Sequence, residues 1–270
     1  MAAFIRKPSR LLLIAAHPDD ETIGAAGLLR ALQLDGSVEI VLAHVTDGAP
    51  ANLRDARAAG FDNAEAYARA RGRELLKALG RLPFGPPTCL TLGVRDQEVV
   101  RNIRGVVDAV SDAIVQSRAN VVITHPYEGG HPDHDATAFA AHAAVQRVAA
   151  TGQAPALFEM TSYHWCGFAL RSGHFLPAAS PVFTLHLGAE ALATKRRMLK
   201  QFRTQRQTIA NLRLAACERF RPAPTYDFAA APNGGRVFYD HFDWGLTSHD
   251  WCLYARSALE ELRLPATQCL

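Results

Sequence analysis

Short apolar runs alternate with helix-like segments through the first 150 residues of the chain. The apolar runs are Leu11–Ala16, Val38–Val45, Cys89–Val94 and Val121–Thr124. Between the last two, apolar residues in the segment 101–115 recur every three or four positions, which places them on one face of a helix. Such alternation is typical of a parallel sheet with helices on both faces. The sequence therefore predicts an α/β, Rossmann-like core over residues 1–150.

The alternation stops beyond Thr151, and the passage 221–235 is rich in proline and glycine. The elements expected there are short strands at Ala156–His164 and Val182–Leu187, a basic helix near Ala191–Leu214, and a last helix, Asp250–Leu262, capped by Ser248. No internal repeat or obvious linker separates the two regions. We therefore expect one domain over residues 1–270, in which residues 151–270 form a mixed α/β extension packed on the substrate side of the core.

Two dense polar clusters follow the first and the fourth apolar run. The first is His17-Pro18-Asp19-Asp20-Glu21, and the second extends from His125 to Asp135. In open α/β sheets, ligand sites lie beyond the carboxyl ends of the strands, where the strand order reverses. With the strand order 3-2-1-4, the two clusters would face each other across that crevice.

Three acidic residues beside a histidine repel one another unless a cation or another partner neutralises them. Imidazole and carboxylate ligands together suit zinc, and a catalytic zinc has three protein ligands and an open position. The simplest ligand set takes His17 and Asp20 from the first cluster and His134 from the second. The turn at Pro132 separates His134 from His131, which leaves His131 free to face a substrate.

Each of these residues also has a structural interpretation. Acidic side chains stabilise the N-terminus of a helix, so Glu21 alone would be read as a capping residue. A single histidine is more often a core or surface residue than a ligand. That interpretation is kept for His44, His142, His164, His174, His186, His241 and His249. Two clusters at two strand ends together favour a metal site.

The two motifs, Ala16-His17-Pro18-Asp19-Asp20-Glu21 and Gly130-His131-Pro132-Asp133-His134, resemble the signature pair of the LmbE-like/PIG-L family of zinc N-deacetylases. The similarity in organisation covers roughly residues 10 to 150. The resemblance implies that His17, Asp20 and His134 bind zinc, that Asp19 is the general base, and that His131, oriented by Asp133, stabilises the oxyanion. These roles agree with general chemistry, because a carboxylate outside the ligand set can take a proton from water and a protonated His131 beside Asp133 can donate to developing negative charge.

Substrate recognition has weaker signals. Asp47 follows the second apolar run on the same edge of the sheet, where it could accept hydrogen bonds from sugar hydroxyls. Arg54 and Arg57 follow in a loop and could reach an anionic group. A simple turn at Asp47 and solvated arginines are the structural alternatives. The arginine that usually binds substrate in this family cannot be placed by motif.

The resulting hypothesis is a zinc-dependent hydrolase that removes an N-acetyl or other acyl group from an amino sugar or a sugar conjugate. An amidase or esterase with a non-sugar acyl substrate is the alternative, because zinc, a base and an oxyanion donor serve any acyl transfer to water. A non-catalytic metal-binding or sugar-binding protein would have no use for Asp19 as an unligated base. A dinucleotide-binding oxidoreductase would need G-x-G-x-x-G after the first strand, whereas Gly24 and Gly27 come only later, in the expected helix.

Composition limits the partners. The net charge of +3 is spread along the chain without a basic block, so we expect a small N-acylated sugar or glycoconjugate as partner and no nucleic acid. No apolar run approaches the roughly 20 residues that span a membrane, and the run after Arg10 is short for a signal peptide. The five cysteines form no C-x-x-C pair, which argues against a thiolate metal site. These features predict a cytoplasmic protein without membrane insertion and are compatible with a homo-oligomer.

Overall fold

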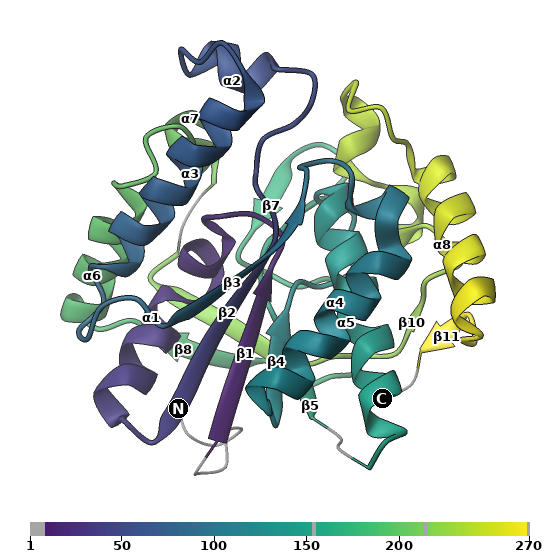
Figure 1. Cartoon of the computed structure of the whole chain (residues 1–270), viewed down its shortest axis with the longest axis horizontal. Coiled ribbons are helices and arrows are strands. Elements are labelled where there is room, and N and C mark those ends of the chain that lie inside the picture. The colour runs from purple at the N-terminus through teal and green to yellow at the C-terminus, as the bar shows by residue number, and fades with distance from the viewer. Residues whose placement is uncertain (1–8, 153–154, 213–214, 269–270) are drawn as a thin grey trace.

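The fold is built on a seven-stranded sheet with the strand order β3-β2-β1-β4-β5-β9-β8 (Figure 1). The computed structural model describes residues 9–152, 155–212 and 215–268. The strands are β1 (Ser9–Ala15), β2 (Val38–Thr46), β3 (Thr88–Val94), β4 (Val121–Thr124), β5 (Ala156–Met160), β8 (Phe183–His186) and β9 (Cys217–Pro222). The strands from β3 to β5 are mutually parallel, whereas β9 is antiparallel to both β5 and β8. The predicted order 3-2-1-4 and the α/β class are confirmed.

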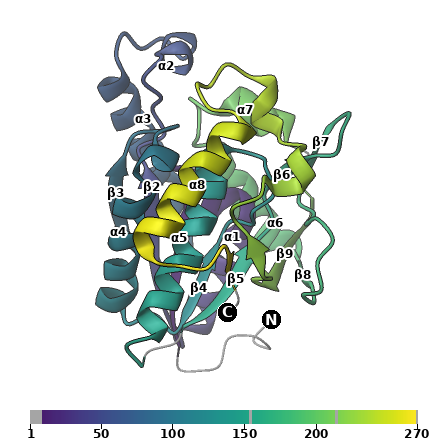
Figure 2. The same ribbon diagram turned by 90° about the vertical axis from the view of Figure 1, so that its right-hand side faces the viewer.

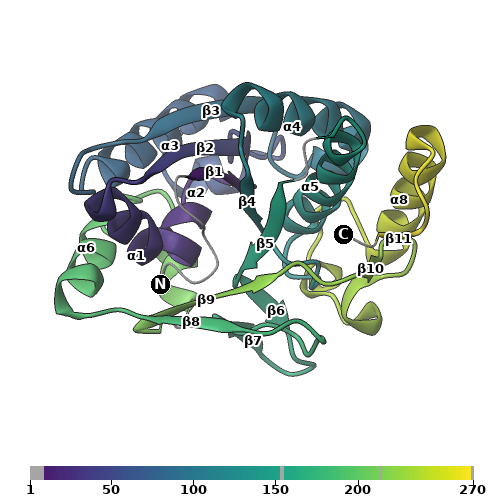
Figure 3. The same cartoon turned by 90° about the horizontal axis from the view of Figure 1, so that it is seen from below.

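The central strand β1 is buried on both faces because helices cover both sides of the sheet (Figure 3). Leu12 and Ile14 belong to one core cluster with α4 (Ile103–Ser117), α5 (Pro132–Ala149) and the more distant α8 (Ser248–Leu262). Leu11 and Leu13 point to the opposite face. That face is covered by α1 (Asp20–Asp35), α3 (Ala64–Leu79) and α6 (Ala189–Leu199). Successive side chains of a strand point to opposite faces of the sheet, so the single apolar run of β1 contributes to both core clusters.

The basic segment expected as one helix near Ala191–Leu214 is instead two helices, α6 and the short α7 (Arg206–Asn211). Phe202, between them, is 2% exposed and belongs to the same core cluster as α1 and α3. Turning this apolar ring into the core interrupts the helix, so the prediction of a continuous helix was wrong. Its last residues, 213 and 214, lie outside the described part of the chain.

The last helix begins at Ser248, and its N-cap is Thr247 rather than the predicted Ser248. The Thr247 hydroxyl accepts from the backbone amide of Asp250, and the Asp250 carboxylate accepts from the backbone amide of Thr247. The Ser248 hydroxyl donates instead to the Asp240 carboxylate at 2.6 Å. The capping box therefore forms one residue earlier than predicted because Asp240 already engages Ser248.

Smaller elements surround the carboxyl end of the sheet and its second half (Figure 2). They are α2 (Arg54–Ala58), η1 (Val99–Asn102), the hairpin of β6 (Tyr163–Trp165) and β7 (Leu170–Ser172), the ribbon of β10 (Tyr226–Asp227) and β11 (Thr267–Gln268), η2 (Pro232–Gly235) and η3 (Phe238–His241). Among the described residues, no helix has both the length and the apolar character needed to cross a membrane. Cys89, Cys166, Cys217 and Cys252 are free thiols, and Cys269 lies outside the described residues.

Candidate metal centre

The two polar clusters meet at the carboxyl ends of β1 and β4, on either side of a cavity of about 190 Å³. The first cluster forms the turn between β1 and α1, and the second forms the loop between β4 and α5. Residues of both clusters line the cavity, namely His17, Asp19, Asp20, His131 and His134. The reversal of strand order between β1 and β4 therefore brings together residues more than 100 positions apart in the sequence, as the sheet rule predicts.

Three potential ligand atoms converge at one point of this cavity. The His17 Nδ1 atom lies 3.3 Å from Asp20 Oδ2 and 3.3 Å from His134 Nε2. The His134 Nε2 atom lies 3.3 Å from the other Asp20 oxygen, Oδ1. A tetrahedral zinc with bonds of about 2.0–2.1 Å separates its ligand atoms by about 3.3–3.4 Å. The three side chains thus have the donor types and the spacing that a zinc ion requires.

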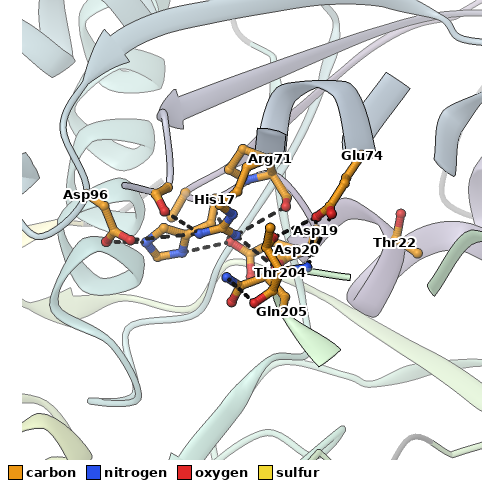
Figure 4. A network of polar contacts seen from close by, with 12 residues as sticks. His17, Asp19, Asp20, Thr22, Arg71, Glu74, Asp96, Thr204 and Gln205 are labelled. Carbon is orange, nitrogen blue, oxygen red and sulfur yellow. Dashed lines mark hydrogen bonds and ion pairs between the residues drawn. The ribbon is translucent and has the colours of Figure 1, made fainter. Parts of the chain in front are cut away.

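The outward-facing nitrogens of the two histidines are also engaged. The His134 Nδ1 atom lies 3.2 Å from the Ser162 hydroxyl, and the His17 Nε2 atom lies 3.1 Å from Asp96 Oδ1 and 3.3 Å from Asp133 Oδ2. Metal-bound histidines generally use their second nitrogen in this way, which fixes the tautomer and the ring orientation. Each imidazole therefore presents its other nitrogen to the point where the ligand atoms converge. Figure 4 shows His17 with its contact to Asp96.

Asp19 lies beside these atoms in an unusual backbone conformation, with φ 154° and ψ −23°. Non-glycine residues rarely adopt positive φ, and such strain persists only where the surroundings hold it. Although Asp19 is the N-cap of α1, its side chain makes no capping hydrogen bond. It accepts instead from Arg71 Nη2 at 2.9 Å. Burial raises the pKa of Asp19 to about 7, although the Arg71 guanidinium acts in the opposite direction.

The backbone of Asp19 is held by Glu21, whose side chain is fully buried. The Glu21 Oε2 atom accepts from the Asp19 amide at 3.1 Å and lies 3.1 Å from His44 Nε2. Besides lying in the first turn of α1, where the sequence predicted a capping role, Glu21 thus holds the Asp19 backbone directly. His44 of β2 in turn contacts the Glu21 carboxylate. His44 remains a buried structural histidine, as predicted.

His131 lies next to the converging atoms, with its ring 4.5 Å from that of His17. Its Nδ1 atom accepts from the backbone amide of Asp133 at 3.1 Å, so a neutral ring carries its proton on Nε2. Burial and the neighbouring His17 lower the pKa of His131 well below its usual value. The structure thus favours a neutral donor over the protonated His131 expected from the sequence. Asp133 contacts His131 through its backbone amide, while its carboxylate faces His17.

Neither Asp47 nor Arg54 lines the cavity. The Asp47 Oδ1 atom accepts from the amides of Ala49 at 2.9 Å and Asp96 at 3.3 Å, so this side chain stabilises the turn after β2. Arg54 is exposed on α2, one residue before Asp55, which does line the cavity. Direct contact of Asp47 or Arg54 with a substrate stays a prediction.

Among the cavity-lining residues that the sequence analysis did not select are Arg71, Asp96, Tyr163 and Trp244. Asp96 follows β3, so the rule of strand ends that identified the two clusters could have identified it too. Arg71 lies in the middle of α3 and has no such signal. It is 4% exposed and also donates to the Gly48 carbonyl oxygen at 2.7 Å. Tyr163 and Trp244 come from the region beyond residue 151, where no motif marks them.

Comparisons with known proteins agree with the two-motif pattern. A family model described as "PIG-L: GlcNAc-PI de-N-acetylase" matches residues 12–145. A 1D-myo-inositol 2-acetamido-2-deoxy-alpha-D-glucopyranoside deacetylase of Catenulispora acidiphila is 31% identical over 167 residues, covering 54% of this chain and 47% of that protein. A probable N-acetyl-alpha-D-glucosaminyl L-malate deacetylase of Bacillus subtilis is 31% identical over 129 residues, covering 47% of this chain and 56% of that protein. The chain thus spans about half the length of these curated relatives.

A solved structure of a deacetylase from the biosynthesis pathway of teicoplanin has a similar fold. It superimposes with a TM-score of 0.61 at 18% sequence identity, over 79% of this chain and 97% of that one. At this identity the likeness concerns the fold alone. It extends beyond the family match and therefore includes part of the second half of the chain.

Proposed function

We propose that this chain, which through residues 12–145 belongs to the PIG-L family, is a zinc-dependent hydrolase that removes an N-acetyl group from an amino sugar conjugate. The observation that carries the proposal is the convergence of His17, Asp20 and His134 beside an unligated carboxylate in one cavity. The similarity to deacetylases that are named for N-acetylglucosamine conjugates supports an amino sugar as the acylated part. A zinc amidase or esterase with a non-sugar substrate is the alternative.

In the proposed mechanism, His17, Asp20 and His134 would hold the zinc ion. A zinc ion bound there would supply Lewis acidity, which makes water a better nucleophile at neutral pH and polarises a carbonyl group. Asp19 takes the proton from the attacking water and delivers it to the departing amine, so the amide is cleaved to acetate and a free amine. Arg71 fixes the Asp19 carboxylate through the 2.9 Å hydrogen bond. The Nε2–H group of His131 donates to the carbonyl oxygen as that atom becomes negative.

Metal content and acetate release measured together test this proposal. The purified protein is analysed for metals, stripped with a chelator and reloaded with one equivalent of zinc. We expect stripping to abolish the release of acetate from N-acetylglucosamine conjugates, and zinc to restore it. Simple acetyl amides and esters serve as the non-sugar arm of the panel. Full activity of the metal-free protein would contradict the proposal, and preferential cleavage of the simple amides or esters would favour the alternative.

Variants separate the ligands from the neighbouring donor. His134→Ala should lose both zinc and activity, whereas His131→Ala should retain zinc and lose roughly 10²–10³ in kcat, the usual scale for one missing oxyanion donor. His186→Ala is the matched control, because this histidine is exposed at the end of β8. A His131→Ala protein without zinc would exchange the roles of His131 and His134.

A further inference from the structure

The cavity at the metal centre continues into a much larger groove. The groove has a volume of about 980 Å³, against about 190 Å³ for the cavity. Asp55, Gln205 and Thr208 line both, so the two spaces adjoin. Ligand pockets usually occupy about 300–1,000 Å³, so the cavity alone is smaller than a typical pocket, whereas the groove reaches the upper end of that range. A substrate with its acylated end at the metal centre therefore has room to extend into the groove.

One wall of this groove, hereafter the α3–α7 groove, is fastened to α3. The Glu74 carboxylate accepts from the Thr204 hydroxyl at 2.6 Å and from the Thr204 amide at 3.2 Å. Next to it, Gln205 Nε2 donates to the Tyr67 hydroxyl at 2.6 Å. Figure 4 shows Glu74 pointing towards Thr204, and Gln205, next to Thr204, lines the same cavity as Asp19 and Asp20. Contacts with α3 thus hold Thr204 and Gln205 in place. Gln205 lines both the cavity of the metal centre and the groove.

Two guanidinium groups give the α3–α7 groove its charge. Arg203 and Arg206 line it, and neither side chain forms a hydrogen bond or an ion pair with any residue in the described part of the chain. The acidic residues that face the groove are Glu74, already engaged by Thr204, and Asp55, at the end shared with the cavity. Arg203 and Arg206 therefore present two unpaired positive charges to the groove, and unpaired guanidinium groups pair well with carboxylate or phosphate.

We propose that the α3–α7 groove binds the part of the substrate beyond the acylated sugar, and that this part carries a carboxylate or a phosphate held by Arg203 and Arg206. The inference rests on the proposed function for the acylated end and adds the chemical class of the remainder. Both arginines lie outside residues 12–145, so this specificity belongs to the second half of the chain.

Matched probes with and without the anion test the inference. The probes are the methyl glycoside of N-acetylglucosamine, its carboxymethyl glycoside and N-acetylglucosamine 1-phosphate. The double variant Arg203→Gln/Arg206→Gln removes the two charges. Its control, Arg73→Gln/Arg196→Gln, removes two exposed charges from α3 and α6 outside the groove. Binding is measured by calorimetry in an Asp19→Asn background, and kcat/KM is measured with an intact Asp19.

We expect at least one anionic probe to bind the parent and the control at least about fivefold more tightly than the neutral probe, a modest value because each pair is exposed. This advantage should shrink with added salt and disappear in the double variant, while kcat for the neutral probe stays the same. The carboxylate and phosphate arms show which anion is preferred. Equal binding of all three probes, or a preference that survives in the double variant, would overturn the inference.

The outcome for the groove is separate from the outcome for the proposed function. Acetate release with no preference for the anionic probes over the neutral probe would contradict the anion-binding groove but leave the deacetylase activity supported. Binding that depends on Arg203 and Arg206 without any acetate release would retain the anionic site and contradict the deacetylase activity.

Discussion

Buried charged groups are arranged differently in the two halves of the chain. In residues 12–145, the buried side chains of His17, Asp20 and His134 direct their polar atoms to one point in a cavity. In the second half, buried charges are neutralised within the protein. Lys195 lies 2.9 Å from Glu218, and Arg221 lies 2.8 Å from Glu159. Convergence of donors on a cavity indicates a ligand site, whereas ion pairs that do not line that cavity, such as these two, are typical of structural support.

The paired charges of the second half join it to the first. The Glu218 carboxylate accepts from the amides of Gly27 at 2.9 Å and Leu28 at 3.0 Å, so β9 is fastened to α1. Arg221 lies 3.1 Å from Glu128, in the loop that leads to His131. The second half is therefore joined to helix α1 and to the loop between β4 and α5, and the proposed chemistry itself belongs to the first half.

Replacing the proposed base should have the largest effect on rate. Asp19→Asn keeps the size and one acceptor oxygen but removes the basicity, so we expect kcat to fall by about 10²–10⁴ with zinc content unchanged. Single-turnover kinetics and metal analysis of the same preparation measure both quantities. Loss of zinc would make Asp19 a ligand, and near-normal turnover would remove it from the chemistry.

Breaking the ion pairs of the second half should affect stability instead. Arg221→Met leaves Glu128 and Glu159 without their buried cation, which should lower the free energy of unfolding by about 3–5 kcal/mol. Denaturant unfolding measures this loss. Arg10→Met is the control, since its pair with Glu39 is on the surface and should contribute about 0.2–1 kcal/mol. Unchanged stability together with a large loss of kcat would break the distinction between the two halves.

Within the first half, Glu21 is expected to act through Asp19. Glu21→Gln keeps the size of the side chain but removes the negative charge from the oxygen that contacts both the Asp19 amide and His44 Nε2, so both contacts are weakened. We expect kcat to fall roughly tenfold, equivalent to about 1.4 kcal/mol, with zinc content and KM unchanged. The same change in an Asp19→Asn background should add little further loss.

Glu39→Gln, on the exposed face of β2, is the control for this series. Independent, multiplicative losses in the Glu21→Gln/Asp19→Asn protein would show that Glu21 does not act through Asp19.

Much of the core and its two clusters could be predicted because the signals are local. The apolar runs are periodic, and the clusters follow strand ends, so strand order alone brings His17 and His134 together. Arg71 could not be predicted, because its contact with Asp19 depends on how α3 packs across the sheet. The break between α6 and α7 was missed for a similar reason, since only the tertiary structure shows that Phe202 enters the core.

The smallest expected effect concerns Trp244, a residue of the second half that lies beside the proposed chemistry. Its ring is half-buried, lines the cavity, lies 4.8 Å from the His131 ring and stacks on Phe242. A flat aromatic face beside the site can pack against the apolar face of a sugar, and the apolar area that this removes from water contributes about 25 cal/mol per Å². Trp244→Ala should therefore raise KM for the sugar substrate about two- to tenfold with little change in kcat, whereas Trp244→Phe should retain most of the affinity. Steady-state kinetics on both variants measure this split. A fall in kcat with unchanged KM would mean that Trp244 supports the orientation of His131, and the second half would then take part in the chemistry as well as in recognition.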